Sequence, residues 1–223
     1  MQYADTNKSD LRLLPLDTAN ISRLLEPFIQ LDEMRLAAIS KYIDLLIKWN
    51  ARINLTAIRV PQEIVQRHFG ESLFAAQRIL AEEPVKSAID LGSGAGFPGV
   101  PFALLAPESE VTLIESNQKK STFLKELIYV LGLRNVKAFS GRAESYSQSA
   151  DLVMLRAVEK FGEVLPLARK LVLPGGRLTL LIGTSQIELA GGLLPGVRWQ
   201  EPLAIPGGHS RVLLVGTKMV KVE

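Results

Sequence analysis

The strongest constraint on the fold of this chain is the alternation of strand-like and helix-like segments that begins near residue 85. Short runs of β-branched and apolar residues predict strands at 87–91, 110–115, 136–140, 152–155 and 177–182. Apolar residues at helical spacing predict helices between them, near 98–105, 119–132 and 159–173. Strands that alternate with helices in this way form a parallel sheet with right-handed crossover connections. We therefore predict an α/β domain over residues 84–223.

The end of this domain breaks the alternation. Segments 197–205 and 212–217 both have strand-like composition, and they flank the turn Pro206-Gly207-Gly208. Two strands joined by a short glycine-containing turn pair as an antiparallel hairpin. The predicted sheet is therefore mostly parallel with one antiparallel C-terminal strand, which is the arrangement of Rossmann-like methyltransferases.

The residues before this domain are predicted to be helical. Apolar residues recur at helical spacing from Asp17 to Trp49, which predicts two amphipathic helices. A third helix is predicted from Pro61 to about Ala81, because proline suits the first turn of a helix. The chain is thus divided into a polar tail (1–16), an N-terminal helical subdomain (17–83) and a Rossmann-like domain (84–223).

The residues that the chain lacks exclude several kinds of chemistry. It has no cysteine, which excludes disulfides, thiolate metal sites and a cysteine nucleophile. His68 and His209 are far apart in the sequence and no group of carboxylates accompanies them, so no metal site is predicted. No apolar run reaches the roughly 18 to 20 residues of a membrane span, and the first residues lack the pattern of a secretory signal. We expect a cytoplasmic protein, and nothing in the sequence requires more than a monomer.

A glycine-rich turn, AIDLGSGAGFPG at 88–99, follows the first predicted strand. Its glycines let the backbone turn sharply and approach a ligand closely, so we expect a nucleotide-like ligand against Gly92 and Gly94. The turn also fits the G-x-G-x-x-G dinucleotide pattern, with Glu115 about twenty residues further on, so an NAD-linked oxidoreductase is one alternative. Two features favour S-adenosylmethionine over NAD. An acid, Asp90, stands before the first glycine, and the chain lacks a second domain that could hold a hydride acceptor.

Polar residues follow the next three predicted strands, at the edge of the sheet where ligands of open α/β folds bind. Glu115, Ser116 and Asn117 end the second strand, and the Glu115 carboxylate suits both hydroxyls of a ribose. Gly-Arg-Ala-Glu at 141–144 follows the third strand and suits an adenine edge, and Arg156 ends the fourth. Each residue also has a structural interpretation, as a solvated strand end, a helix-start acid or a surface ion pair. Their occurrence at successive strand ends favours a pocket.

Six motifs in the chain occur in a familiar order: KWNARINLTAI (48–58), RHFGESL (67–73), DLGSGAGFPGV (90–100), VTLIESNQKKSTFL (111–124), GRAE (141–144) and LRAV (155–158). Together they resemble the bacterial 16S ribosomal RNA guanine(527)-N7 methyltransferases, also called glucose-inhibited division protein B. The resemblance implies a class I S-adenosylmethionine methyltransferase fold, S-adenosylmethionine as cofactor, and 16S rRNA or the small ribosomal subunit as partner. The family's cofactor contacts fall on Gly92, Phe97, Glu115, Ser116, Asn117, Ala143, Glu144 and Arg156. The chain departs from the family at Glu71, usually an aspartate, in its longer N-terminal tail and in the hairpin GGHSR (207–211).

The implied target needs no general base. Guanine N7 has an unprotonated lone pair at neutral pH and can attack a sulfonium methyl group directly. The chain also lacks the [DNS]-P-P-[YF] motif of exocyclic amine methyltransferases, because Leu155-Arg156-Ala157-Val158 follows the fourth strand instead. Catalysis then consists of orienting the reacting atoms, and we expect the Arg156 guanidinium to bind a phosphate or a carboxylate.

An RNA substrate requires a basic surface at the mouth of the pocket. The formal net charge of +3 permits such a partner without requiring one. Candidate substrate contacts are Arg142, Arg156, Lys119 and Lys120, with scattered solubilising charge as the alternative interpretation. We interpret His68 as a packed or hydrogen-bonded structural histidine, and Trp49 as a core residue with base stacking as the alternative. Asn50, Asn54 and Thr56 are interpreted as capping and turn residues, with RNA contacts as the alternative. A noncatalytic RNA-binding protein remains a third possibility.

Overall fold

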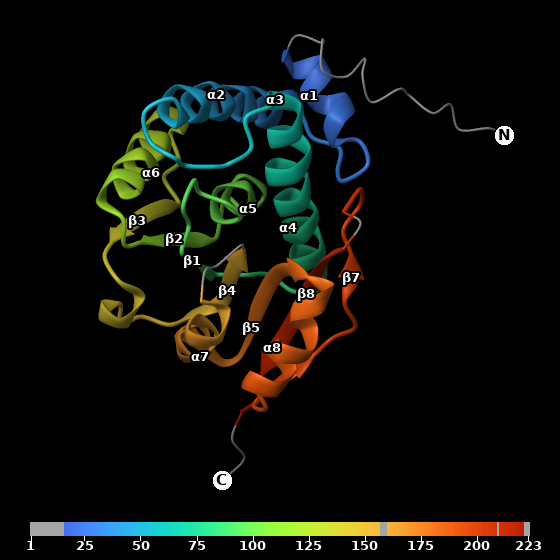
Figure 1. Ribbon diagram of the computed structural model, residues 1–223, viewed down its shortest axis with the longest axis vertical. Coiled ribbons are helices and arrows are strands. Elements are labelled where there is room, and N and C mark those ends of the chain that lie inside the picture. The colour runs from blue at the N-terminus through green and yellow to red at the C-terminus, as the bar shows by residue number, and fades with distance from the viewer. Residues whose placement is uncertain (1–15, 157–159, 209, 221–223) are drawn as a thin grey trace, which may run out of the picture.

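The predicted strands form one sheet in the computed structural model, which describes residues 16–156, 160–208 and 210–220 (Figure 1). The strands are β1 (Ser87–Leu91), β2 (Glu110–Glu115), β3 (Val136–Ser140), β4 (Ala150–Arg156), β5 (Val172–Gly183), β6 (Val197–Trp199), β7 (Leu203–Ala204) and β8 (Arg211–Lys218). Their order across the sheet is β3-β2-β1-β4-β5-β8-β6, and β7 pairs with β8. The predicted polar tail lies outside the described residues, except for residue 16.

The direction of the strands confirms the predicted mixed sheet. Strands β1 to β5 pair in parallel, and β8 pairs antiparallel with β5, β6 and β7. The turn at 206–208 joins β7 to β8 as the expected hairpin. The predicted strand over 197–205 is divided between β6 and β7, because Pro202 has no backbone N–H to donate to the neighbouring strand.

The helices cover both faces of this sheet. Successive residues of β4 point to opposite faces, so that Leu152 and Met154 join one cluster of buried side chains and Val153 joins the other. The first cluster is covered by α1 (Thr18–Leu25), α2 (Glu33–Asn50), α4 (Glu71–Glu82), α5 (Gly99–Leu105) and α6 (Gln118–Leu131). The second is covered by α7 (Phe161–Leu171) and α8 (Ile187–Leu193), the latter not predicted from the sequence. The division of the chain at residue 83 stays a prediction.

The helix predicted from Pro61 to Ala81 differs from a regular α-helix in its middle. It consists of α3 (Pro61–Glu63), the π-helical segment η2 (Ile64–Gly70) and α4. At Gly70 the backbone passes so close to Phe28 that a Cβ atom would lie 2.7 Å from the Phe28 ring. A π-helical turn has one more residue than an α-helical turn, and such turns often occur at functional sites. Here the turn carries His68 towards the carboxyl end of the sheet.

Each helix within residues 16–156, 160–208 and 210–220 is too short or too polar to span a lipid bilayer.

Candidate active site

The glycine-rich turn after β1 has the backbone conformation that its sequence predicts. Gly92, Gly94 and Gly96 have φ angles of 74°, 56° and 93°, a region that residues with a side chain rarely adopt. The amides of Gly92 and Ser93 both donate to the Ile114 carbonyl of β2 at 3.0 Å, which fixes the turn to the sheet. A Cβ atom added to Gly92 would have no neighbour within 4 Å. The turn therefore borders open space.

Asp90 ties the two ends of this turn together. Its Oδ2 atom accepts a hydrogen bond from the Gly99 amide at 3.0 Å, at the start of α5. The side chain is fully buried, and Oδ1 has no hydrogen-bond partner among residues 16–156, 160–208 and 210–220. Burial raises the pKa of Asp90 to about 7, and the hydrogen bond from Gly99 opposes this change. Asp90 thus has a structural role beneath the turn.

Glu115, the last residue of β2, has its carboxylate directly beside the glycine turn. Oε2 accepts a hydrogen bond from the Gly94 amide at 2.9 Å, and Oε1 accepts one from the Asn117 amide at 2.7 Å. A carboxylate oxygen can accept more than one hydrogen bond, so each oxygen retains capacity for a ligand hydroxyl. The Asn117 side chain in turn caps α6 by accepting from the amides of Lys119 and Lys120.

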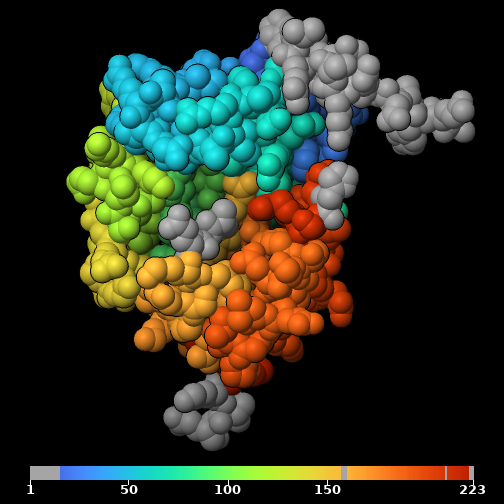
Figure 2. Space-filling view, viewed as in Figure 1, coloured from blue at the N-terminus to red at the C-terminus, as the bar shows by residue number. Residues whose placement is uncertain are grey.

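Two adjoining cavities lie over the carboxyl ends of β1 to β4. The larger, about 540 Å³, is lined by Leu55, Thr56, Ala57, His68, Gly92, Ser93, Gly94, Ala95, Phe97, Glu115, Ser116, Asn117, Lys120 and Arg156. The smaller, about 150 Å³, is lined by Leu91, Gly92, Ile114, Glu115, Ser116, Gly141, Arg142, Ala143, Glu144, Val164 and Leu167. Gly92, Glu115 and Ser116 border both, so the two form one cleft with Glu115 at its junction. In Figure 2 the dark green atoms near the centre of the view lie recessed between the blue and cyan N-terminal part and the orange part, whereas the light green segment at the left belongs to the outer surface.

The structure brings together every residue predicted to contact the cofactor. Gly92, Gly94, Phe97, Glu115, Ser116, Asn117 and Arg156 line the larger cavity, and Ala143 and Glu144 line the smaller one. Of the predicted substrate contacts, Lys120 borders the larger cavity and Arg142 the smaller. Lys119 is exposed at the start of α6 and lines neither cavity.

Arg156 has the carboxylate partner that was expected of it. Its Nη2 atom donates to Glu71 Oε2 at 2.9 Å and to the Arg67 carbonyl at 2.6 Å. The same Glu71 oxygen accepts a hydrogen bond from Arg211 Nε at 2.9 Å. Because the side chains of Glu71 and Arg156 are only 4% and 8% exposed, this ion pair is buried. Glu71 therefore holds two arginines, one from β4 and one from β8, side by side.

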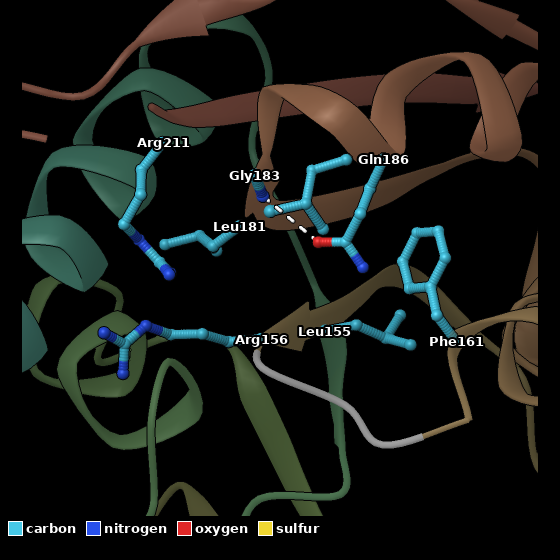
Figure 3. A pocket seen from close by; sticks show the side chains of 8 residues that line it. Leu155, Arg156, Phe161, Leu181, Gly183, Gln186 and Arg211 are labelled. Carbon is cyan, nitrogen blue, oxygen red and sulfur yellow. Dashed lines mark hydrogen bonds between the residues drawn. The ribbon is translucent and has the colours of Figure 1, made fainter. Parts of the chain in front are cut away.

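A third cavity, of about 60 Å³, borders Arg156 outside the cleft (Figure 3). Arg156 and Arg211 line one end of it, and Gln186 and Phe161 line the other. The Gln186 side-chain oxygen accepts a hydrogen bond from the Gly183 amide at 3.1 Å. Among the described residues, neither Arg156 Nε nor Arg211 Nη2 has a hydrogen-bond partner, although both atoms are buried. The arginine pair thus has donors left for an anion.

His68 and Thr56 also belong to the cleft, although the sequence suggested structural roles for them. The His68 ring stacks on Phe97 with 4.9 Å between ring centroids. Its Nδ1 atom lies 2.7 Å from Arg156 Nη1, and its Nε2 atom lies 2.7 Å from Thr56 Oγ1. The interpretation of His68 as a packed, hydrogen-bonded histidine is therefore right but incomplete. The sequence gives no signal for its place in the cleft, because His68 lies in the π-helical segment, which the spacing of apolar residues does not distinguish from an α-helix.

Comparison with known proteins supports the fold first. P. horikoshii TYW2 in complex with MeSAdo superposes with a TM-score of 0.56 at 18% identity, covering 69% of this chain and 63% of that one. Ribosomal protein L11 methylase from Lactobacillus delbrueckii subsp. bulgaricus gives a TM-score of 0.59 at 12% identity, covering 69% and 79%. These similarities establish the fold of class I S-adenosylmethionine methyltransferases.

Sequence comparison establishes the family. The family model for rRNA small subunit methyltransferase G matches residues 35–191. The chain belongs to the rRNA small subunit methyltransferase G family. A member from Chromobacterium violaceum is 34% identical over 199 residues, which cover 87% of this chain and 94% of the relative. A member from Stenotrophomonas maltophilia (strain K279a) is 40% identical, covering 75% and 79%. Membership of the methyltransferase G family confirms the resemblance described above and favours neither an NAD-linked oxidoreductase nor a noncatalytic RNA-binding protein.

Proposed function

We propose that this chain transfers the methyl group of S-adenosylmethionine to N7 of a guanine in small-subunit ribosomal RNA, at position 527 in the numbering of 16S rRNA, and that it does so as a cytoplasmic monomer. Family membership and the fold support S-adenosylmethionine-dependent methylation of ribosomal RNA. The observation that carries the proposal is the cleft with Glu115 at the junction of its two cavities.

The residues of the cleft fit S-adenosylmethionine. Open space beside Gly92 allows the cofactor to approach the backbone closely. The Glu115 carboxylate retains acceptor capacity for two ribose hydroxyls, and Ala143 and Glu144 border the smaller cavity, where we place the adenine. We place the methionine part in the larger cavity, near Arg156. When bound, S-adenosylmethionine supplies an electrophilic methyl group on a sulfonium sulfur.

The chain's own residues bind and orient, and none of them has to take a proton. Guanine N7 is a hydrogen-bond acceptor with a free lone pair, so the new nitrogen–carbon bond forms without deprotonation. Burial and the neighbouring charge of Arg156 lower the pKa of His68 to about 3, which keeps its ring neutral. Both ring nitrogens have partners within the protein, so His68 is not a general base. Orientation of the reacting atoms can by itself contribute several kcal/mol.

The RNA is proposed to bind at the mouth of the cleft. Lys120 and Arg142 border the two cavities and are placed to contact phosphates. Arg156 Nε and Arg211 Nη2 have no hydrogen-bond partner in the described part of the chain, and both arginines line one end of the cavity of about 60 Å³, so these donors suit another phosphate. We expect Lys119 to contribute only through its charge, because it lines neither part of the cleft.

The decisive experiment is mass spectrometry of nucleosides from small-subunit ribosomal RNA of cells with and without the gene. We expect 7-methylguanosine to disappear without the gene and to return when the purified protein and S-adenosylmethionine are added to the unmodified RNA. Unchanged 7-methylguanosine would contradict the proposal.

Calorimetry with S-adenosylhomocysteine and with NADH tests the cofactor separately, and binding of NADH alone would refute the cofactor assignment.

A further inference from the structure

Thr56 lies in a loop whose position is fixed by Asn50, the last residue of α2. Asn50 Oδ1 accepts hydrogen bonds from the amides of Leu55 at 2.9 Å and Thr56 at 3.0 Å. Asn50 Nδ2 donates to the Thr56 carbonyl at 3.0 Å. The Asn50 side chain is buried, so these bonds are shielded from water. Thr56 is thus held firmly at the wall of the larger cavity.

The partners of His68 determine which of its nitrogens carries the proton. A guanidinium group has only donors, so Arg156 Nη1 donates to His68 Nδ1, and Nδ1 must be unprotonated. The proton of the neutral ring is therefore on Nε2, which lies 2.7 Å from Thr56 Oγ1. A ring protonated on both nitrogens would place an N–H group against the donor of Arg156. His68 thus donates to the Thr56 hydroxyl.

This direction of donation determines what the Thr56 hydroxyl can do. A hydroxyl oxygen accepts two hydrogen bonds and donates one. Thr56 Oγ1 accepts one from His68 Nε2 and one from the Ile58 amide at 3.1 Å. Its own proton has no acceptor within the described part of the chain, and the side chain borders the larger cavity. The hydroxyl is therefore a fixed donor at the border of the larger cavity, the part of the cleft in which the proposed function places the reactive end of the cofactor.

We propose that Thr56 determines the base specificity of the enzyme by donating a hydrogen bond to the 6-oxo group of the target guanine. This inference rests on the proposed function. Guanine has two neighbouring acceptors, N7 and O6, on its major-groove edge, whereas adenine has a donor, the N6 amino group, beside N7. A donor at Thr56 matches guanine and opposes adenine. The ion pair of Glu71 and Arg156 acts through His68 as a positioning element.

The first test uses the wild-type protein and a fragment of small-subunit ribosomal RNA that contains the target guanosine. The target guanosine is replaced by inosine, which keeps the 6-oxo group, or by 2-aminopurine, which keeps N7 and the 2-amino group but lacks the 6-oxo group. We expect inosine to be methylated with a kcat/KM near that of guanosine, and 2-aminopurine with one about tenfold lower, the usual effect of one lost hydrogen bond. Equal rates for guanosine and 2-aminopurine would overturn the inference. No methylation of guanosine would instead contradict the proposed function.

The second test uses substitutions at Thr56. In Thr56→Val we expect the rates with guanosine and 2-aminopurine to become equal, whereas Thr56→Ser should restore the preference because it keeps the hydroxyl. The matched control is Thr122→Val on α6, since Thr122 is exposed and its hydroxyl donates only to the Gln118 carbonyl within its own helix. Circular dichroism checks that each variant is folded.

The alternative partner of the Thr56 hydroxyl is an acceptor on the cofactor, such as its carboxylate, and calorimetry distinguishes this partner from the base. We expect Thr56→Val to bind S-adenosylhomocysteine with unchanged affinity. A tenfold loss of that affinity, together with a retained preference for guanosine, would assign the hydroxyl to the cofactor and overturn the inference.

Discussion

Replacement of Glu71 by glutamine tests the electrostatics of the cleft most directly. Its carboxylate is 4% exposed, and one oxygen accepts hydrogen bonds at 2.9 Å from both Arg156 and Arg211. Removing one partner of a buried ion pair typically costs about 3–5 kcal/mol, because a buried charge is left without compensation. We expect a loss near the lower end, about 3 kcal/mol, because the glutamine carbonyl still accepts a hydrogen bond. The loss is limited further because the Arg211 side chain is 23% exposed, so that water can partly solvate its charge.

The loss is measured by urea unfolding at neutral pH, followed by circular dichroism. In a thermal scan it corresponds to a decrease in Tm of about 6–12 °C for a chain of this length. The control is Glu163→Gln, because Glu163 pairs with Lys160 at 3.3 Å and both side chains are more than 70% exposed. Exposed pairs contribute little, so we expect no measurable change in the control. A loss below about 1 kcal/mol for Glu71→Gln, or the same loss for both variants, would refute the inference that this charge holds the two arginines.

Three further predictions concern the cleft. Gly92→Asp should abolish binding of S-adenosylhomocysteine in calorimetry while the far-ultraviolet spectrum stays unchanged, because its side chain enters the open space where the cofactor is placed; retained binding would contradict that placement. Glu115→Gln should weaken the same binding by about tenfold, because a charged acceptor of hydroxyl groups is lost, and an unchanged affinity would argue against the ribose assignment. His68 has a pKa of about 3 in the folded chain and an ordinary value of 6.5. Its contribution to stability is therefore complete above pH 6.5 and decreases as the pH falls towards 3. Between neutral pH and pH 5, the free energy of unfolding measured in urea should decrease by about 2 kcal/mol more for the wild type than for His68→Gln. If the free energies of the two proteins changed in parallel with pH, the inference that His68 is neutral in the folded chain would be refuted.

The fold could be predicted to a large extent because its determinants are local. The continuous apolar run of β4, which is buried on both faces of the sheet, and the helical spacing in α2 and α6 result from contacts with the two clusters of buried side chains, so the pattern of apolar residues reveals each element. The π-helical turn at 64–70 could not be predicted in this way. Its last residue, Gly70, lies close to the ring of Phe28, a residue distant in the sequence, and the spacing of apolar residues does not report such a contact.

The candidate site was predictable where it follows the strands and unpredictable elsewhere. The pattern of strands is enough to predict that Gly92, Glu115 and Arg156 lie along one edge, because the ends of parallel strands meet at the same side of a sheet. The packing of the folded chain, in contrast, is needed to show that Glu71 joins Arg156 to Arg211, which lies 140 positions from Glu71 in the sequence, and that His68 reaches Thr56. Hydrogen bonds between distant residues depend on how helices pack against the sheet, and no local period in the sequence encodes that packing.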